Sequence, residues 1–301
     1  NITMVIPLRL VDLIEIDDGW KIKAESPDGI EQEIITSSVV LATNGFGANA
    51  ERVARHIPEV VDGLYFGGDH SLGDALEIGE RLGADVGFLD AYQGHGSVAT
   101  PHGVLITWTA MMNGAFLVNA NGQRFGDETT GYSEFAVKVI AQPESQAWMI
   151  YDKAVHEKAL PFADYQQMVE SGGIRWTDDV AGLASLIGCD EAAISATLEG
   201  IANFGSGAAV DPLGRTLWPH DLEPPFTAIK VTGALFHTQG GLCVNEHANV
   251  LRGGKTIAGL YAAGGAAIGI SGNGASGYLS GNGLLSALGL GYLAGRAIGH
   301  G

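Results

Sequence analysis

Glycine is concentrated in the last part of this chain, and that concentration restricts what the segment can form. The sequence has 45 glycines among 301 residues, about twice the average share. They cluster around residues 264–301. Glycine lets a backbone come close to a ligand or to another backbone, because it has no Cβ. We interpret the cluster as a region of close approach rather than low complexity, and therefore as a first indication of a cofactor.

The overall composition is that of a folded chain with an acidic surface. Hydrophobic residues make up 46%, and 34 acidic residues stand against 16 basic ones, for a net charge of −18. A chain of this length buries a sizeable core, as two domains or one large one. The negative charge repels nucleic acid and anionic membranes, so we expect neither as a partner.

Cysteine and histidine spacing predicts no metal site. Cys189 and Cys243 are far apart and fit no metal or redox motif. There is no apolar run of about 18 residues, as a membrane span requires, and no signal peptide. We expect a cytoplasmic protein. Because the chain opens directly on strand-like sequence without Met, we also expect that a segment normally precedes Asn1.

The first hundred residues alternate short strands and helices. Residues 2–43 predict a β-meander that leads into one buried strand, Val39–Thr43. A helix is expected around 49–56. Another is expected over Leu72–Leu82, where apolar residues recur at helical spacing and Gly83 ends the pattern.

Between residues 101 and 228 the sequence pattern changes, and short strands alternate with helices. Strands are expected near 103–108, 114–125 and 147–152, and helices at 133–141, 152–159, 178–187 and 190–203. Strands return at 227–235 and 256–263, followed by a helix near 282–298. We predict an α/β domain made of residues 1–100 and 229–301, interrupted by an inserted α+β cap at 101–228.

A G-x-G-x-x-G string occurs at Gly272–Gly277. The dinucleotide fingerprint opens a βαβ unit and meets an acidic residue about 20 positions later. The chain reaches Gly301 without such a residue. We interpret the match as accidental and expect the true fingerprint to lie upstream of Asn1.

Five segments, in order along nearly the whole chain, resemble the fumarate reductase/ketosteroid dehydrogenase flavoprotein superfamily. They are residues 39–58 (with ATNGFG), 67–84 (with GDALEIG), 113–136 (with GQRFGDE), 236–245 (FHTQGGLCVN) and 259–295 (with GLYAAGG and SGNG). The resemblance implies a glutathione-reductase-like FAD-binding α/β domain, incomplete at the N-terminus, with an inserted cap. It also implies FAD as cofactor and an oxidoreductase that acts on CH–CH groups.

The resemblance assigns a set of positions to the cofactor. Glycines after a buried strand would admit the adenosine half of FAD, and the amino end of the last helix would stabilise negative charge on the reduced flavin. Asp74 matches a flavin-contacting aspartate, and its structural alternative is the N-cap of the 72–82 helix. The implied cofactor-binding residues are Ala42, Thr43, Asn44, Gly45, Asp74, His237, Gly264, Gly265, Asn282, Gly283 and Leu284.

The substrate side departs from the fumarate reductase pattern. Tyr132 stands where the family has its acid-catalyst arginine, Tyr278 where it has a substrate-clamping arginine, and Phe236 where it has a histidine. Trp108 and Met111 replace the glutamate and arginine of the proton path, and His95 alone keeps its type. Without cations nothing offsets the desolvation of two carboxylates. We therefore expect a neutral, apolar substrate.

The two tyrosines resemble the site pattern of the ketosteroid dehydrogenases. DETTGYS carries Tyr132, and Tyr278 with Ser280 forms a Tyr-x-Ser pair. Forming a double bond beside a ketone needs a donor on the oxygen, a base at the α-carbon and a hydride acceptor at the β-carbon. Tyr278 would donate, Tyr132 would remove the proton, and flavin N5 would take the hydride.

A phenol has a pKa near 10 and needs a positive neighbour to act as a base at neutral pH. His95 or His237 is the expected source of that charge. In the structural alternative, Tyr132 and Tyr278 only pack and His95 belongs to the core.

Three functions stay open at this point. The first is an FAD-dependent oxidoreductase that acts on CH–CH bonds next to a carbonyl of a neutral, 3-oxosteroid-like substrate, with an unidentified electron partner. The second is a fumarate-reductase-like reductase of an unsaturated acid, for which a cap arginine such as Arg175 or Arg215 would turn into the cleft. The third is a fragment or binding module without cofactor.

Overall fold

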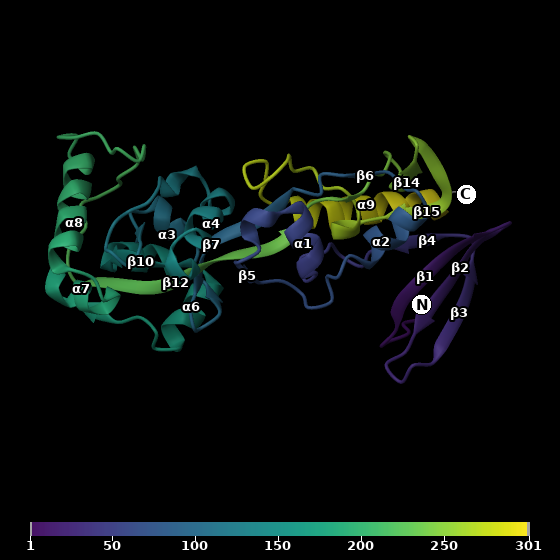
Figure 1. The fold of residues 1–301 in the computed structure, drawn as a ribbon, viewed down its shortest axis with the longest axis horizontal. Helices are drawn as coiled ribbons and strands as arrows, with labels where there is room; N and C mark the ends of the chain where they lie inside the picture. The colour runs from purple at the N-terminus through teal and green to yellow at the C-terminus, as the bar shows by residue number, and fades with distance from the viewer. Residues whose placement is uncertain (1, 300–301) are drawn as a thin grey trace. The chain divides into compact units, whose positions relative to one another are not determined.

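In the computed structural model the described residues, 2–299, form two compact units (Figure 1). Each unit combines segments that are separated in the sequence. The first unit contains residues 1–58, 67–93 and 237–301, and the second contains 59–66 and 94–236. The mixed α/β fold class that the sequence predicts is confirmed. The assignment of residues 1–100 and 229–301 to a flavin domain and of 101–228 to a cap stays a prediction.

The first unit is built from short strands, α-helices and one 3-10 turn. Its elements are β1 (Arg9–Ile16), β2 (Gly19–Glu25), β3 (Glu31–Thr36), β4 (Val39–Leu41), α1 (Ala50–His56), α2 (Asp74–Arg81), β6 (Val86–Gly87), β13 (Gly241–Leu242), β14 (Asn249–Arg252), β15 (Lys255–Ala262), η4 (Gly264–Ala266) and α9 (Asn282–Gly299).

The meander β1-β2-β3 is antiparallel throughout. Gly19 begins β2 with φ +139°, a value that L-residues rarely adopt, so the turn between β1 and β2 requires glycine. Alternation along β1 and β2 buries Leu13 and Trp20 in the core. The predicted meander is confirmed, but β1 begins at Arg9 rather than at residue 2.

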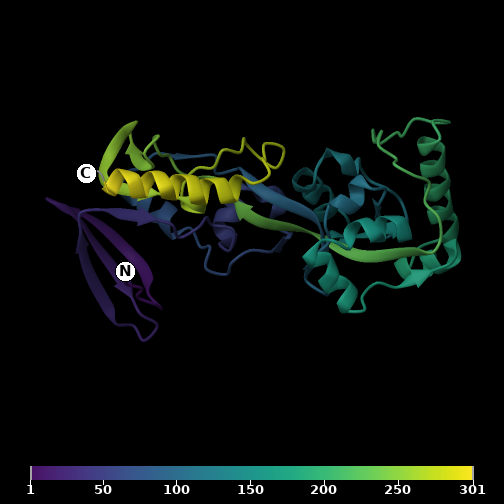
Figure 2. The ribbon, with the colours of Figure 1, turned by 180° about the vertical axis from the view of Figure 1, so that it is seen from behind.

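A second sheet in this unit has the order β14-β15-β4. β15 pairs antiparallel with β14 and parallel with β4, so that Leu260, Tyr261 and Ala262 lie opposite Val39, Val40 and Leu41. Helix α9 packs along β15 and η4, with Ala294 buried in that contact (Figure 2). The carboxyl ends of β4 and β15 therefore meet at one edge of the sheet.

The second unit alternates strands and helices around a larger sheet. Its elements are η1 (Pro58–Val60), β5 (Leu64–Tyr65), β7 (Tyr92–Ala99), β8 (Val104–Leu105), α3 (Thr109–Met112), β9 (Phe116–Val118), η2 (Glu128–Thr130), α4 (Tyr132–Ile140), η3 (Pro143–Ser145), β10 (Gln146–Asp152), α5 (Lys153–Ala159), α6 (Ala163–Glu170), β11 (Trp176–Thr177), α7 (Val180–Ile187), α8 (Glu191–Gly205) and β12 (Phe226–Thr238). The outermost residues of η1, β7 and β12 belong to the first unit.

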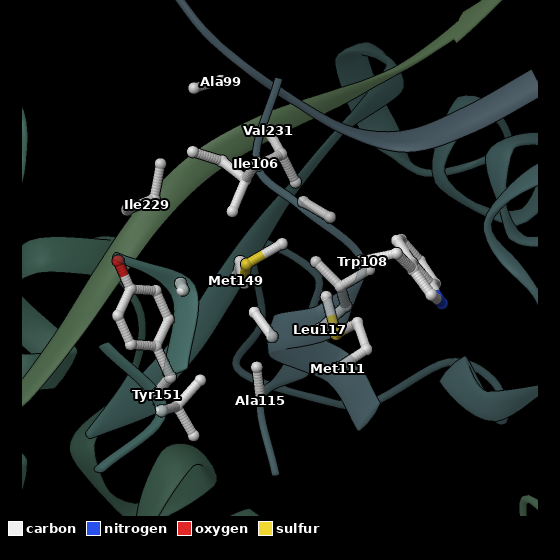
Figure 3. Packing of buried hydrophobic residues seen from close by; sticks show 14 of the residues in the cluster. Ala99, Ile106, Trp108, Met111, Ala115, Leu117, Met149, Tyr151, Ile229 and Val231 are labelled. Atoms are coloured by element: carbon white, nitrogen blue, oxygen red, sulfur yellow. The ribbon is translucent and has the colours of Figure 1, made fainter. Parts of the chain in front are cut away.

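The sheet of the second unit runs β8-β7-β12-β10-β9, and both of its faces are buried. Side chains alternate across the sheet along each strand. On β10, Met149 and Tyr151 face the cluster shown in Figure 3, while Ile150 faces the cluster under α7 and α8. The same alternation places Val231 of β12 in the first cluster and Ala228 in the second.

Most predicted elements of the cap region are confirmed within one or two residues at each end. The strand β7 was not predicted, because its sequence YQGHGSVA contains two glycines and few apolar residues. Helix α6 was also not predicted. β7 nevertheless lies in the interior of the sheet, where five of its residues from Gly94 to Val98 are buried.

A buried ion-pair cluster joins distant parts of the second unit. Glu128, fully buried, accepts hydrogen bonds from Arg124 at 2.8 and 3.1 Å and from Arg215 at 3.2 Å. Arg124 also pairs with Asp211 at 2.8 Å, and Arg215 donates to the carbonyls of Ala115, Met111 and Leu217. Two carboxylates thus balance two guanidinium groups in the interior.

We predict that Glu128→Gln lowers the free energy of unfolding by about 3–5 kcal/mol, because removal of one partner leaves a buried charge uncompensated. Urea denaturation measures this loss. Glu77→Gln is the control, because Glu77 pairs with Arg81 on an exposed helix face and should lose less than about 0.5 kcal/mol. Equal losses in the two variants would contradict the proposed cost.

Candidate functional site: a glycine-lined strand edge and a histidine-centred aromatic cluster

The residues after β4 approach those after β15 closely. A Cβ on Gly45 would collide with Thr238 Oγ1, and a Cβ on Gly265 would collide with Asn44 Oδ1 and lie 2.8 Å from Gly45 N. The side chain of Thr238 is held here because its Oγ1 accepts a hydrogen bond from Phe46 N at 3.1 Å. Both positions therefore require glycine.

Asn44 takes an unusual backbone conformation at this edge. Its φ is +65°, in the left-handed region that asparagine tolerates better than most residues. Its side chain donates to Ser71 Oγ at 2.8 Å, and the neighbouring Thr43 Oγ1 accepts from Ala75 N at 3.2 Å. Two predicted cofactor residues thus tie the strand end to the start of α2.

Asp74 does not act as the N-cap of α2. The helix begins at Asp74, and its N-cap is Gly73, which makes no side-chain capping bond. The Asp74 carboxylate instead pairs with Arg9 at 3.3 Å. The structural alternative for Asp74 is therefore wrong, and its role toward a flavin stays a prediction.

Helix α9 begins where the sequence predicts. Gly281, with φ +85°, precedes it, and the buried Asn282 accepts from Ile270 N at 2.7 Å. Gly283 lies against the ring of His237, since a Cβ there would be 3.2 Å from the ring atoms Cε1 and Nε2. Leu284 is largely exposed. The structure brings His237, Asn282 and Gly283 together at the amino end of this helix.

A polar chain links His237 to the loop that carries Tyr278. Gln239 Nε2 lies 3.1 Å from Nδ1 and 3.2 Å from Nε2 of His237, and its Oε1 accepts from Ser271 Oγ at 3.2 Å. Ser271 Oγ in turn accepts from Leu279 N, directly after Tyr278, at 3.1 Å. Sequence reasoning missed Gln239 and Ser271. The signal was Gln239 in FHTQGG where the family has methionine.

The G-x-G-x-x-G string forms a closed turn within this loop. Gly272 N donates to the carbonyl of Gly277 at 2.8 Å, and Gly277 N donates to that of Asn273 at 3.1 Å. The turn follows η4 and precedes α9, so it opens no βαβ unit. The interpretation of this match as accidental agrees with the geometry.

In the second unit, His95 on β7 lies among aromatic rings. The rings of Tyr132 and Phe236 are nearly parallel to the imidazole, at 22° with centroids 4.9 and 5.4 Å away, and Trp108 meets it edge-on at 5.5 Å. Phe66 packs on Phe236 at 5.2 Å. Tyr132, His95, Phe236 and Trp108, which the sequence placed on the substrate side, are thus brought together.

His95 is uncharged in this environment. The residue is 5% exposed, and burial lowers the pKa of its imidazole to about 3. Burial also lowers the pKa of His237 in the first unit. The expectation that His95 supplies a positive charge to Tyr132 is therefore wrong, because at neutral pH the ring carries none.

The cap arginines do not behave alike. Arg215 is fully buried in the cluster with Glu128, so the expectation that it turns into a cleft is wrong. Arg175 is exposed, between α6 and β11. Met111, another position on the predicted proton path, belongs to the core (Figure 3).

Tyr278 and Ser280 lie in the loop before α9 in the first unit, and Tyr132 is the first residue of α4 in the second. Ala42 follows β4 and is exposed, and Gly264 begins η4 with φ +60°. The catalytic roles of Tyr132, Tyr278, Ser280 and His95 stay predictions, as do the individual flavin contacts.

Comparison with known proteins settles the family. The sequence profile described as "FAD binding domain" matches residues 14–284. The chain belongs to this FAD-binding family. The prediction of FAD as cofactor is thereby confirmed at the level of the family.

Relatives of the FAD-binding chain include fumarate reductases. It is 28% identical over 301 residues to "Fumarate reductase (cytochrome)" of Shewanella frigidimarina, covering 98% of this chain and 52% of the relative. The structure titled as the open conformation of a flavocytochrome c3 fumarate reductase matches with TM-score 0.78 and 28% identity, covering 96% of this chain and 51% of that one.

A steroid enzyme is also similar to this chain. The 3-ketosteroid-delta4-(5alpha)-dehydrogenase of Rhodococcus jostii RHA1, solved with 4-androstene-3,17-dione, matches with TM-score 0.66 and 26% identity, covering 96% of this chain and 58% of that one. The predicted superfamily is confirmed. The chain spans about half the length of these relatives.

Two features of the described residues bear on possible partners. Within residues 2–299 no single helix is long and apolar enough to cross a membrane, although the bent pair α7 and α8 together meets that length and composition. In the same part of the chain no group of three or more His, Cys, Asp or Glu side chains could hold a metal ion.

The backbone at the strand edge fits a flavin nucleotide. Half-exposed Gly264 and Gly265 lie beside the end of β4, and free N–H groups begin the 18-residue helix α9. We predict that Gly265→Ala destabilises the protein by about 1–3 kcal/mol through overpacking and abolishes flavin retention. Thermal melting and absorbance of the purified protein measure both.

Gly291→Ala is the matched control for this substitution. A Cβ on Gly291, in the middle of α9, meets no atom within 4 Å. Replacement of a helical glycine by alanine should stabilise the protein by about 0.5–1 kcal/mol. Similar melting temperatures for the Gly265→Ala and Gly291→Ala proteins would contradict the collision at Gly265.

The pKa of His95 predicts an acid sensitivity. Below the ordinary value of 6.5 an unfolded histidine binds a proton, whereas the folded His95 does not until about pH 3. Stability is therefore lost as pH falls from about 6.5 toward 3, by several kcal/mol in total. Urea denaturation across this range should give a shallower pH dependence for His95→Gln than for wild type.

His247→Gln is the control for the acid sensitivity, because His247 is mostly exposed. Its pH dependence should match that of wild type. A His95→Gln protein with an unchanged slope would show that His95 titrates freely in the folded state.

Proposed function

We propose that this chain is the core of an FAD-dependent oxidoreductase that acts on a CH–CH bond next to the carbonyl of a neutral, 3-oxosteroid-like substrate. The observation that carries the proposal is the uncharged His95 stacked between aromatic side chains in the second unit.

The cost of desolvation supports a neutral substrate. A buried carboxylate needs a cation or several donors to offset the loss of water. The stack offers a neutral imidazole and the faces of Tyr132 and Phe236. The buried guanidinium of Arg215 is already bonded to Glu128 and to three backbone carbonyls. A flat, apolar ketone suits such a surface better than a dicarboxylate.

The reaction is a balanced desaturation, or its reverse. Tyr278 donates a hydrogen bond to the ketone oxygen and stabilises the developing enolate. Tyr132, as its phenolate, takes the proton that leaves the α-carbon, and Ser280 supports Tyr278 in the Tyr-x-Ser pair. FAD, when bound, accepts the hydride from the β-carbon. The phenolate forms when Tyr132 loses its proton to solvent, and because His95 is neutral its ring supplies no charge that favours this loss. Tyr278 assists the transfer from the substrate side by making the α-carbon more acidic.

The predicted cofactor residues would hold FAD in the first unit. The strand edge at Thr43, Asn44 and Gly45 would receive the adenosine half. His237 and the start of α9 at Asn282–Leu284 would border the isoalloxazine. Gly264, Gly265, Ala42 and Asp74 complete the proposed contacts. An electron donor or acceptor of unidentified chemistry would complete the cycle, and a cytoplasmic location stays part of the proposal.

A second candidate function is the reduction of an unsaturated carboxylic acid. The similarity to the fumarate reductase of Shewanella frigidimarina over 98% of this chain favours it. A single carboxylate clamp would have to come from an exposed cation such as Arg175. Turnover of mono- and dicarboxylic enoates with reduced viologen separates this candidate from the first.

We predict that the purified protein shows a flavin band in the near-visible and oxidises 3-oxosteroids with an artificial electron acceptor. Tyr278→Phe should lower kcat by roughly 10²–10³, the effect of removing one oxyanion donor. Steady-state kinetics measures this loss. Unchanged kcat in that variant would defeat the role of Tyr278.

Tyr292→Phe is the matched control, because Tyr292 is an exposed tyrosine on α9. It should leave kcat unchanged. A colourless protein that takes up no added FAD would instead support the third possibility, a binding module without cofactor.

A further inference from the structure

A chain of two hydrogen bonds fixes the ring of His95. Ser97 Oγ lies 3.0 Å from His95 Nδ1 and donates to the backbone carbonyl of Ile106 at 2.7 Å. Ser97 is fully buried, and it lies two residues from His95 on the same strand, so both side chains point to the same face of the sheet.

The number of protons available to these two hydrogen bonds identifies the tautomer of His95. A serine hydroxyl has one hydrogen, and a carbonyl can only accept. If Ser97 donated to Nδ1, its oxygen and the Ile106 oxygen would stand 2.7 Å apart without a proton between them. Because the Ser97 hydroxyl donates its one hydrogen to the Ile106 carbonyl, Nδ1 must be the protonated nitrogen that donates to Ser97 Oγ. Nε2 then carries a lone pair in the plane of the ring.

The second nitrogen of His95 has no protein partner. Among residues 2–299 no hydrogen bond joins Nε2 to a side chain or backbone group. The ring is 5% exposed and packs against Tyr132, Phe236 and Trp108. Nε2 is not one of the fully buried side-chain atoms that lack a partner in the described part of the chain, so its lone pair is open to a ligand that brings a donor.

We propose that His95 Nε2 accepts a hydrogen bond from an uncharged O–H donor on the substrate, and that Ser97 is the positioning residue that fixes this tautomer. The inference rests on the proposed function for the entry of substrate beside the aromatic rings. It adds a requirement to the neutral ketone: a hydroxyl group that faces His95.

The same tautomer disfavours carboxylates. An ionised carboxylate is an acceptor only, so its oxygen would meet the lone pair of Nε2 without a proton between them. Protonation of the ring would relieve this contact, but burial lowers the pKa of His95 to about 3. The lone pair of His95 Nε2 therefore favours a hydroxyl group of the ligand and disfavours a carboxylate at the same position.

The first experiment is nitrogen-15 NMR of the flavin-loaded protein with labelled histidine, with His95→Gln to assign the ring. Nδ1 of His95 should resonate as a protonated nitrogen and Nε2 as an unprotonated one. Protonation at Nε2 would overturn the proposal directly. This readout needs no turnover, so it stays informative even if the proposed reaction fails.

The second experiment titrates three cyclohexanones that differ only at carbon 4: 4-hydroxycyclohexanone, 4-methylcyclohexanone and 4-oxocyclohexanecarboxylate. The hydroxyl probe should shift the Nε2 resonance and bind about tenfold more tightly than the methyl probe, the effect of one hydrogen bond. The proposal would be overturned if the methyl or carboxylate probe shifted the Nε2 resonance as much as the hydroxyl probe does. It would also be overturned if none of the three probes shifted it.

Two variants test the role of Ser97. Ser97→Ala should give a mixture of tautomers and lose the roughly tenfold preference for the hydroxyl probe, while Ser97→Thr keeps the hydroxyl and should restore both. A preference that survives in a folded Ser97→Ala protein would refute the positioning role. Should that variant fail to fold, the tautomer and the probe preference of the wild type still decide the proposal.

Discussion

The parallel pairing of β4 with β15 is the constraint on which the first unit depends. β4 has three residues, yet its register against Leu260–Ala262 sets where the chain emerges at the edge of the sheet. Because both strands end at this edge, Asn44 and Gly45 come against Gly265 so closely that neither glycine admits a Cβ. At this contact Asn44 takes its left-handed backbone conformation, and Thr238 Oγ1 accepts a hydrogen bond from Phe46 N. A short strand thus determines the surface that we propose for the flavin.

In the second unit, the cost of removing charge from water decides which buried groups are charged. Charged groups are buried where they have full partners, as Glu128 has in Arg124 and Arg215. His95 lies against Ser97 and aromatic rings, and it stays neutral. The same physical rule therefore produces a stable ionic cluster at one place and an uncharged acceptor at another. The difference lies in the partners that the fold supplies, since both places exclude water.

The sequence predicted those parts of the molecule that local pattern determines. Helical spacing identified α2 and α9, and glycine-rich segments identified the edge where strands and helix meet. Strand β7 was missed because its glycines and polar residues hide an interior strand, which tertiary pairing with β12 stabilises. The charge of His95 and the engagement of Arg215 could not be predicted, because burial and hydrogen-bond partners arise only from contacts between segments distant in sequence. The hydrogen bond between Gln239 and Ser271 arises in the same way, because it joins residues 32 positions apart in the sequence.

Ionic strength should act on the two units in different ways. In the first unit the ion pairs, such as Arg81 with Asp12 and Arg252 with Glu15, are open to solvent. Dissolved salt screens such pairs over about 10 Å at 0.1 M, and it also weakens the mutual repulsion of a chain with a net charge of −18. The pairs of Arg124 and Arg215 lie beyond the reach of counterions. The dissolved salt can therefore weaken the exposed ion pairs of the first unit, while the buried pairs of Arg124 and Arg215 in the second keep a strength that the fold sets.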